Sequence, residues 1–147
     1  MRRGDESVCL AIAIGEFPIR AVTFEVGARR PLGLGAAGLA LLASTTPEEA
    51  LAISLRNERQ LEASGVSVAT LEKRLEATRK RGYALSEGTI TEGVTGIATV
   101  VRPRAGEPFL AVSVAAISAR MPKSRHSKIV SLLHRAAKDT AALVATS

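Results

Sequence analysis

A cluster of glycines, Gly33, Gly35 and Gly38, runs directly into the Ala/Leu-rich segment that ends at Ser44. Glycine tolerates tight backbone geometry and lets a ligand approach the main chain closely, and the alanines and leucines that follow favour a helix. The N–H groups at a helix start have no partners within the helix and lie at the positive end of its dipole. The cluster therefore predicts a helix start that can bind an anionic group of a small molecule.

The same glycines spell the G-x-G-x-x-G pattern of dinucleotide-binding proteins, but their surroundings do not fit it. That fingerprint requires a strand directly before the glycines and an acidic residue near the end of the next strand, about 20 residues on. Here Arg29, Arg30 and Pro31 separate the glycines from the preceding apolar run, and the acid at that distance, Glu58, lies in a charged helical pattern. A nicotinamide site is not predicted. The alternative to a ligand site that stays open is a buried Ala/Gly helix packed closely on a sheet.

The titratable residues form no catalytic or metal-binding set. His126 and His134 have no carboxylate or cysteine near them at ligand spacing, so both are predicted to be exposed helix residues. Cys9 is the only cysteine and is predicted to lie in the core. Glu87 and Glu92 are predicted to be solvated loop residues. No metal and no cofactor is therefore expected.

Composition and charge narrow the function classes further. The formal net charge is +6, but the cations are scattered and aromatic residues make up only 3%. Proteins that stack on nucleobases usually have more aromatics, and no recognition helix is evident, so specific DNA binding by this chain is not expected. No apolar run approaches the roughly 18 residues that span a bilayer. No signal peptide is visible, and a cytoplasmic location is expected.

Two helices follow the glycine-rich segment. Thr46 as the cap, Pro47 at the first position and Glu49 form a capping box, which predicts a helix to about Gln60. Ser67 caps a second helix, whose last turn contains three cations and is followed by a glycine. Cations in the last turn interact favourably with the negative end of the helix dipole, and glycine commonly ends a helix.

Five strands are predicted from apolar runs and alternation: 8–14, which reads as buried, 19–26, 83–86, 94–101 and 109–117. Gly96 interrupts its strand and indicates a bulge or close approach by a ligand. Ser113 is the one polar residue of its strand, and it either makes a hydrogen bond in the core or faces a pocket.

A closing helix is predicted from Lys123 to about Val144. Its expected apolar face consists of Ile129, Leu132, Leu133, Ala136, Thr140 and Leu143. The element order β-β-α-α-α-β-β-β-α has consecutive strands joined by short turns and helices in blocks, which predicts an α+β fold around an antiparallel sheet.

An ordered set of loose motifs resembles one family. The segment from Gly27 to Ala43 resembles the glycine-rich part of the effector-binding domain of IclR-type bacterial transcription regulators. The helix start Pro47-Glu48-Glu49, the helix end LEATRKRGY, and the strand motifs GVTGIA and AVSVAA follow in the same order as in that family.

The resemblance implies a GAF-like fold, with an antiparallel sheet flanked by helices, over a single effector-binding domain of residues 1–147. It implies binding of a small carboxylate-bearing effector, self-association as a dimer or tetramer, and no enzymatic or membrane role. In the family a winged helix-turn-helix binds operator DNA. That domain, and the helix that usually opens the effector domain, are expected to be absent from this chain.

The resemblance also implies ligand-binding positions. The amides of Ala36 and Ala37 would hold the effector's carboxylate, Ile19, Val22 and Val94 would form apolar walls, and the family's polar groups fall at Ser86, Gly96, Ser113 and Ala115. Those four places are often Asp, Cys, Ser and Ser in members that bind small oxo-acids, so only Ser113 is kept. Leu39 stands where a lysine is common. We therefore expect a roomier pocket for a larger, more apolar acid.

Two alternative functions belong to other classes: a small stand-alone enzyme acting on an acidic metabolite, and an oligomerisation module without a ligand. A ligand-dependent thermal shift that leaves the ligand unchanged favours sensing, product formation favours the enzyme, and silence across a metabolite library favours the module.

Overall fold

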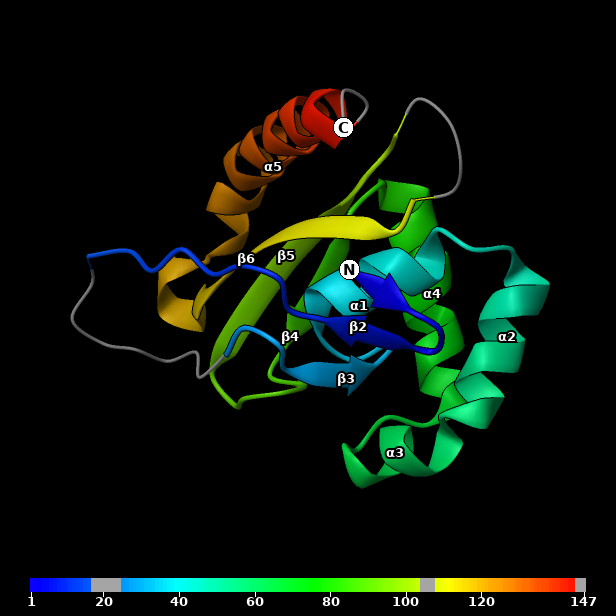
Figure 1. Cartoon of the computed structure of the whole chain (residues 1–147). Coiled ribbons are helices and arrows are strands. Elements are labelled where there is room, and N and C mark those ends of the chain that lie inside the picture. Colours follow the sequence, from blue (N-terminus) through cyan, green and yellow to red (C-terminus); the bar gives the residue numbers. More distant parts are fainter. Residues whose placement is uncertain (17–24, 104–107, 145–147) are drawn as a thin grey trace.

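Two three-stranded antiparallel sheets form the framework of the computed structural model, which describes residues 1–16, 25–103 and 108–144 (Figure 1). The first sheet has the order β1-β2-β3, with bounds Arg2–Arg3, Glu6–Val8 and Arg29–Pro31. The second has the order β4-β5-β6, with bounds Ala84–Glu87, Val94–Val101 and Leu110–Ile117. A hydrogen bond of 2.7 Å from the Arg2 N–H to the Phe109 carbonyl oxygen connects β1 to the start of β6.

Helices cover both faces of the second sheet. The bounds are Gly35–Ala43 for α1, Pro47–Arg56 for α2, Glu58–Ala63 for α3, Val68–Arg81 for α4 and Lys123–Val144 for α5, with a 3₁₀ turn at Ser118–Arg120. Figure 1 shows α1 and α5 on opposite sides of β5. Within the described ranges, none of the helices combines the length and apolar content that crossing a bilayer requires.

The caps predicted for α2 and α4 are confirmed. The Thr46 hydroxyl accepts a hydrogen bond of 3.2 Å from the Glu49 N–H, and the Ser67 hydroxyl accepts one of 3.1 Å from the Thr70 N–H. Such caps satisfy N–H groups that the helix itself leaves free. The helix α4 ends at Gly82 in the left-handed conformation, as predicted.

The predicted helix to Gln60 divides in two. Asn57 lies between α2 and α3, and its side-chain N–H donates to the Asp5 carbonyl oxygen at 2.8 Å. This hydrogen bond to a distant part of the main chain holds the interruption between the two helices in place, and helix propensity alone does not predict it.

The main hydrophobic core is built around α1. Leu39, Leu41 and Leu42 are at most 2% exposed, and they pack with buried side chains of α2, α3 and α4 and with alanines of β4 and β5. A smaller cluster around Ile97, Met121 and Leu133 lies between α5 and the opposite face of the second sheet. Burying each large aliphatic side chain stabilises the fold by about 1.5–3 kcal/mol.

The first predicted strand, 8–14, is wrong beyond Val8, where β2 ends. Cys9 still exchanges backbone hydrogen bonds with Gly27 and Ala28, but the chain leaves the ladder after it. The side chains of Leu10, Ile12 and Ile14 are 50%, 40% and 65% exposed. An apolar run predicts burial only where another element covers it, and none of the described elements covers this one.

The second predicted strand, 19–26, falls largely outside the described residues. Its last two residues, Glu25 and Val26, are not in a strand, and β3 instead includes Arg29 and Arg30, where a loop was predicted. The strand Tyr83 to Ser86 is confirmed with a shift of one residue, and β5 has the predicted bounds.

The predicted apolar face of α5 is rotated relative to the structure. The buried residues are His126, Leu133 and Ala137, whereas Leu132 and Leu143 are 53% and 70% exposed. Adjacent apolar pairs such as Leu132–Leu133 make two neighbouring stripes equally apolar in sequence, so the sequence alone does not select between them.

Candidate functional site

The start of α1 presents unpaired backbone donors. Leu34 caps the helix without a side-chain hydrogen bond, and the first turn contains no acidic residue. The N–H groups of Gly35, Ala36 and Ala37 have no acceptor within the helix, and no acceptor for them appears in the part of the chain that the structure describes. This end of α1 can therefore hold an anionic group.

The register of the second sheet brings the predicted strand positions together. Ser86 lies opposite Gly96, and Gly96 lies opposite Ala115, so the three form one row across β4, β5 and β6. Ser113 lies opposite Ala98 in the next row on the same face, and Val94 shares that face because side chains two apart along a strand point the same way. All five positions therefore lie on the face that α1 covers.

The contact between α1 and this face is made at Gly96. A Cβ atom built on Gly96 would lie 3.2 Å from the Ala36 Cβ. The ladder continues regularly on both sides of Gly96, so there is no bulge, and the group that approaches the glycine is Ala36. The predicted bulge at Gly96 is therefore wrong, and Ala36 packs against the glycine. The role of Gly96 as a ligand-binding position stays a prediction.

Exposure divides the predicted residues into an inner and an outer group. Ala36 is buried, whereas Ala37, Ser86, Val94 and Gly96 are half-buried. Ser113 and Ala115 on β6 are exposed, so Ser113 makes no core hydrogen bond, and it lies on the candidate face. The site is thus closed between α1 and β5 and open along β6.

Ile90 is a residue of this region that sequence reasoning missed. A Cβ atom on Gly35 would lie 2.7 Å from the Ile90 Cδ1 atom, so the Ile90 side chain covers the first residue of α1. Ile90 lies in the turn between β4 and β5 and packs against the main core. The neighbouring Thr89 hydroxyl accepts a hydrogen bond of 3.1 Å from Arg74 of α4, which holds the turn in place. The sequence signal that could have identified Ile90 is that it is a single apolar residue in an otherwise polar turn.

The turn between β1 and β2 supports the entry to α1. The Asp5 carbonyl oxygen accepts a hydrogen bond of 2.9 Å from the Leu32 N–H, next to the glycine cluster. The Asp5 carboxylate accepts two hydrogen bonds from Arg56, at 2.7 and 2.9 Å. The Arg56 guanidinium thereby holds the pKa of that carboxyl below its ordinary value.

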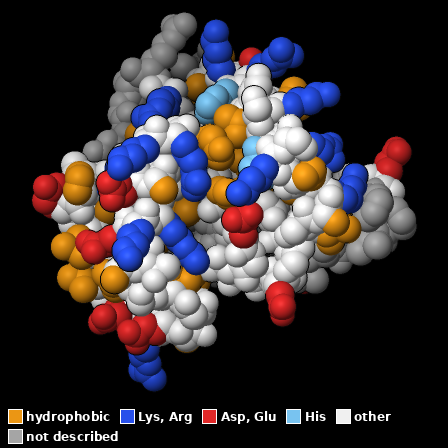
Figure 2. All heavy atoms as spheres, turned by 180° about the vertical axis from the view of Figure 1, so that it is seen from behind, with side chains coloured by type: hydrophobic (Ala, Val, Ile, Leu, Met, Phe, Trp, Pro, Cys, Tyr) orange, Lys and Arg blue, Asp and Glu red, His pale blue; other side chains and the backbone are white. Residues whose placement is uncertain are grey.

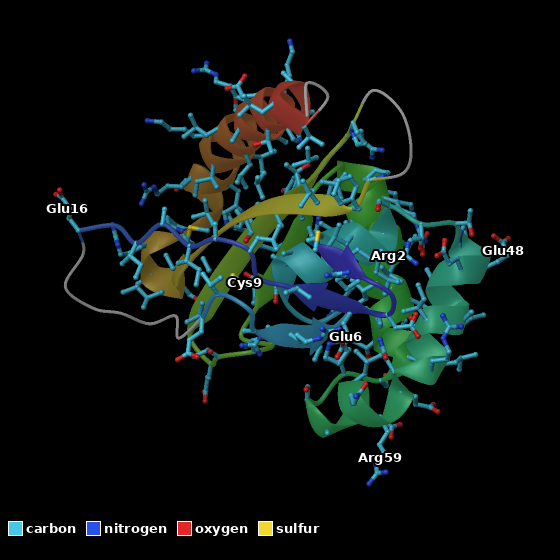
Figure 3. The ribbon with its side chains drawn as sticks, in the orientation of Figure 1. Arg2, Glu6, Cys9, Glu16, Glu48 and Arg59 are labelled. Carbon is cyan, nitrogen blue, oxygen red and sulfur yellow. The ribbon has the colours of Figure 1, made fainter. Side chains whose placement is uncertain are left out.

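Arg2 of β1 adds a second tie between the first sheet and α2. Its guanidinium bonds to the carboxylate of Glu49. Figure 3 labels Arg2 and Glu6 in this sheet and shows Glu16 pointing away from the body of the molecule. The strands of the first sheet and α2 thus fix the position of the segment that leads into α1.

Other predictions on chemistry-bearing residues have mixed outcomes. Ile19 and Val22 lie outside the described residues. His126 is buried, not exposed, and its ring Nε2 lies 2.9 Å from the Met121 carbonyl oxygen. Cys9 is half-buried rather than in the core. Across residues 1–16, 25–103 and 108–144, no group of three or more metal-ligating side chains is close enough to hold an ion.

Comparisons with known proteins identify the family of this chain. A family model described as the C-terminal domain of the bacterial transcriptional regulator IclR matches residues 1–142. The HTH-type transcriptional repressor AllR of Escherichia coli (strain K12) is 28% identical over 144 residues, with 95% of this chain and 52% of AllR aligned. The chain thus spans about half the length of the curated relatives that it matches.

Solved structures agree with this match. The repressor BlcR of Agobacterium tumefaciens superposes with a TM-score of 0.84 at 25% identity, over 98% of this chain and 57% of BlcR. The C-terminal domain of the E. coli transcriptional regulator KdgR superposes with a TM-score of 0.71 at 30% identity, over 82% of this chain and 74% of that one. The chain therefore belongs to the IclR family of bacterial transcriptional regulators, as the C-terminal domain of that family with its GAF-like α+β fold.

Proposed function

We propose that residues 1–147 form one effector-binding domain that senses a carboxylate-bearing metabolite at the start of α1. The observation that supports this most directly is the set of N–H groups of Gly35, Ala36 and Ala37, which lack acceptors in the described structure and have no acid beside them. A carboxylate there would accept charge-assisted hydrogen bonds, which are about twice as strong as neutral ones.

The rest of the ligand would lie along the open side of the site. Val94 and the predicted walls Ile19 and Val22 would contact an apolar body, and the exposed hydroxyl of Ser113 would supply one orienting hydrogen bond. Because alanine or glycine stands at two of the family's polar positions, a compact and highly polar acid would leave a polar group unpaired, which costs about 1–3 kcal/mol. A longer or aromatic acid fits this lining better.

In the parent regulator, ligand binding would modulate operator binding by a separate DNA-binding domain. We include no catalytic step, because the family consists of transcriptional regulators. Self-association as a dimer or tetramer belongs to the proposal and would cover exposed apolar side chains such as Leu10, Ile12 and Ile14. Sedimentation that shows only monomer at micromolar concentration would count against this part.

The test is calorimetric titration of the chain with glyoxylate, pyruvate and a series of aromatic and longer-chain acids, followed by recovery of each ligand. We expect the larger acids to bind more tightly and to be recovered unchanged. Tightest binding of the two small oxo-acids would contradict the argument from polarity, and product formation would favour an enzyme. Silence across the series would favour a ligand-free module.

A further inference from the structure

A groove runs along the outer edge of β4, on the opposite side of the molecule from the view of Figure 1. It consists of two surface hollows, of about 330 Å³ between α4 and β4 and about 610 Å³ between β4 and the start of α5. Both hollows are lined by Arg81, Leu85 and Glu87, so they meet at the strand. We call this feature the β4 groove.

The backbone of β4 is free on the side that faces the groove. Among the described strands, β4 has a neighbour on one side only, namely β5. The Gly88 N–H donates to the Val94 carbonyl oxygen at 2.9 Å, and antiparallel pairs that exchange hydrogen bonds alternate along a ladder. Ser86 therefore bonds toward β5, whereas the N–H and C=O groups of Leu85 and Glu87 point outward, into the groove.

A contact at the base of the strand supports this direction. The Tyr83 carbonyl oxygen, two residues before Leu85, accepts a hydrogen bond of 3.0 Å from the Arg81 side chain rather than from β5. The Arg81 guanidinium also lies over the Tyr83 ring, 5.2 Å from its centroid. The outward acceptors of this edge are thus within reach of groups in the groove.

The groove is strongly cationic. Lys73, Arg74 and Arg81 line it from α4, and Lys123 lines it from α5, against the single carboxylate of Glu87. In the described part of the chain none of these four cations forms an ion pair. Figure 2 shows Lys and Arg side chains gathered around hydrophobic and histidine side chains on this side of the molecule.

We propose that the β4 groove binds an extended, acidic peptide segment of a partner protein, which pairs with β4 as an additional strand. Main-chain hydrogen bonds to Leu85 and Glu87 would align the segment, and its carboxylates would meet the cations of α4 and α5. A second copy of this chain would bring two cationic grooves together, which disfavours it as the occupant. The groove opens at the outer edge of β4, whereas the proposed effector site lies on the face that α1 covers. The strand β4 contributes Ser86 to that face, but the peptide would pair with the outward backbone groups of Leu85 and Glu87.

The test uses a short fluorescein-labelled peptide of alternating Glu and Val and fluorescence anisotropy with the purified chain. Leu85→Pro removes the outward N–H and leaves the ladder with β5 intact, since proline is tolerated where an edge N–H faces outward. We expect roughly tenfold weaker binding by this variant, as a lost ladder hydrogen bond and the added ring predict. The matched control Leu85→Ala keeps the N–H and should bind within about threefold of wild type. Lys73→Glu and Lys123→Glu should each weaken binding and its salt dependence.

A second arm does not depend on the folding of a variant. Two versions of the peptide, one N-methylated on its odd residues and one on its even residues, are titrated against the wild-type chain. Alternate N–H groups of an extended peptide point to opposite edges, and only one edge faces β4. We therefore expect only one of the two peptides to lose binding. Equal binding by both peptides, or no binding of the parent peptide, would overturn the proposal. Displacement by an oligonucleotide with no effect of methylation would identify a nucleic-acid surface instead. A change of oligomeric state in Leu85→Pro would identify a self-interface, and either result contradicts the proposal.

Discussion

Gly96 of β5 and Ala36 of α1 are in direct packing contact, since a Cβ atom on Gly96 would lie 3.2 Å from the Ala36 Cβ. The missing side chain at position 96 lets the first turn of α1 lie against the middle of the sheet. This contact positions the free N–H groups of the helix beside the row formed by Ser86, Gly96 and Ala115.

Gly96→Val should destabilise the fold, because the new side chain must displace α1 from β5. Overpacking of this kind costs about 1–3 kcal/mol, and urea denaturation would measure it. Ala115→Val, in the same row but exposed on β6, is the matched control and should change the free energy of unfolding by no more than about 0.5 kcal/mol. Equal effects of the two substitutions would contradict the contact.

Gly35→Ala should be destabilising for two separable reasons. Gly35 has a φ of 68°, a left-handed conformation that costs other residues about 1–2 kcal/mol, and its new methyl group would meet the Ile90 side chain. In the double variant with Ile90→Ala the second cost is relieved and the first remains. A double-mutant cycle from denaturation curves should give a coupling energy of about 0.5–3 kcal/mol. Simple additivity would mean that Ile90 does not cover the helix start.

Ala36→Leu and Ala37→Leu should have different effects, although the residues are adjacent. Ala36 is 7% exposed and packs on Gly96, so a leucine there should lower the melting temperature strongly. Ala37 is half-buried at the helix start, so Ala37→Leu should keep the fold and fill the space that a carboxylate needs. Circular dichroism and calorimetry on both variants check this. Unfolding of Ala37→Leu would identify the region as core packing only.

Stability should fall on acidification through Asp5. Its pKa is held below the ordinary value by hydrogen bonds from Arg56, so the contribution of this pair is present above about pH 4, the ordinary carboxyl range. It is lost as the pH falls through the lower folded-state pKa. Asp5→Asn should melt at a lower temperature than wild type at neutral pH, and the difference should vanish in strong acid. A difference that persists there would mean that Asp5 acts through its backbone contacts alone.

Local signals predicted the helices and the second sheet well. The hydroxyls of Thr46 and Ser67 accept the predicted capping hydrogen bonds, and Gly82 ends its helix as predicted. The alternation and β-branched residues of β5 fixed its bounds from Val94 to Val101. Caps, helix ends and strand patterns are determined by residues that lie close together in the sequence, so they can be predicted from the sequence alone.

Features that depend on distant partners were not predicted. The strand β3 includes Arg29 and Arg30, whose charge indicated a loop, because its pairing with β2 comes from the fold rather than from side-chain pattern. His126 is buried through its contact with the Met121 carbonyl oxygen, which polarity does not reveal. At the site, the glycine-rich helix start was predicted, but the covering role of Ile90 depends on how the β4–β5 turn folds back over α1.

The hydrogen bond between Arg2 and Phe109 joins β1 to the start of β6, and these two strands are far apart in the sequence. Closing so long a loop carries a large entropic cost before the contact forms, whereas β4, β5 and β6 are consecutive and pair through local connections. Folding should therefore begin in the segment from α4 to α5, and the strands β1–β3 should dock later. The strands β1–β3, which are synthesised before the segment from α4 to α5, are then among the last elements to reach their native partners.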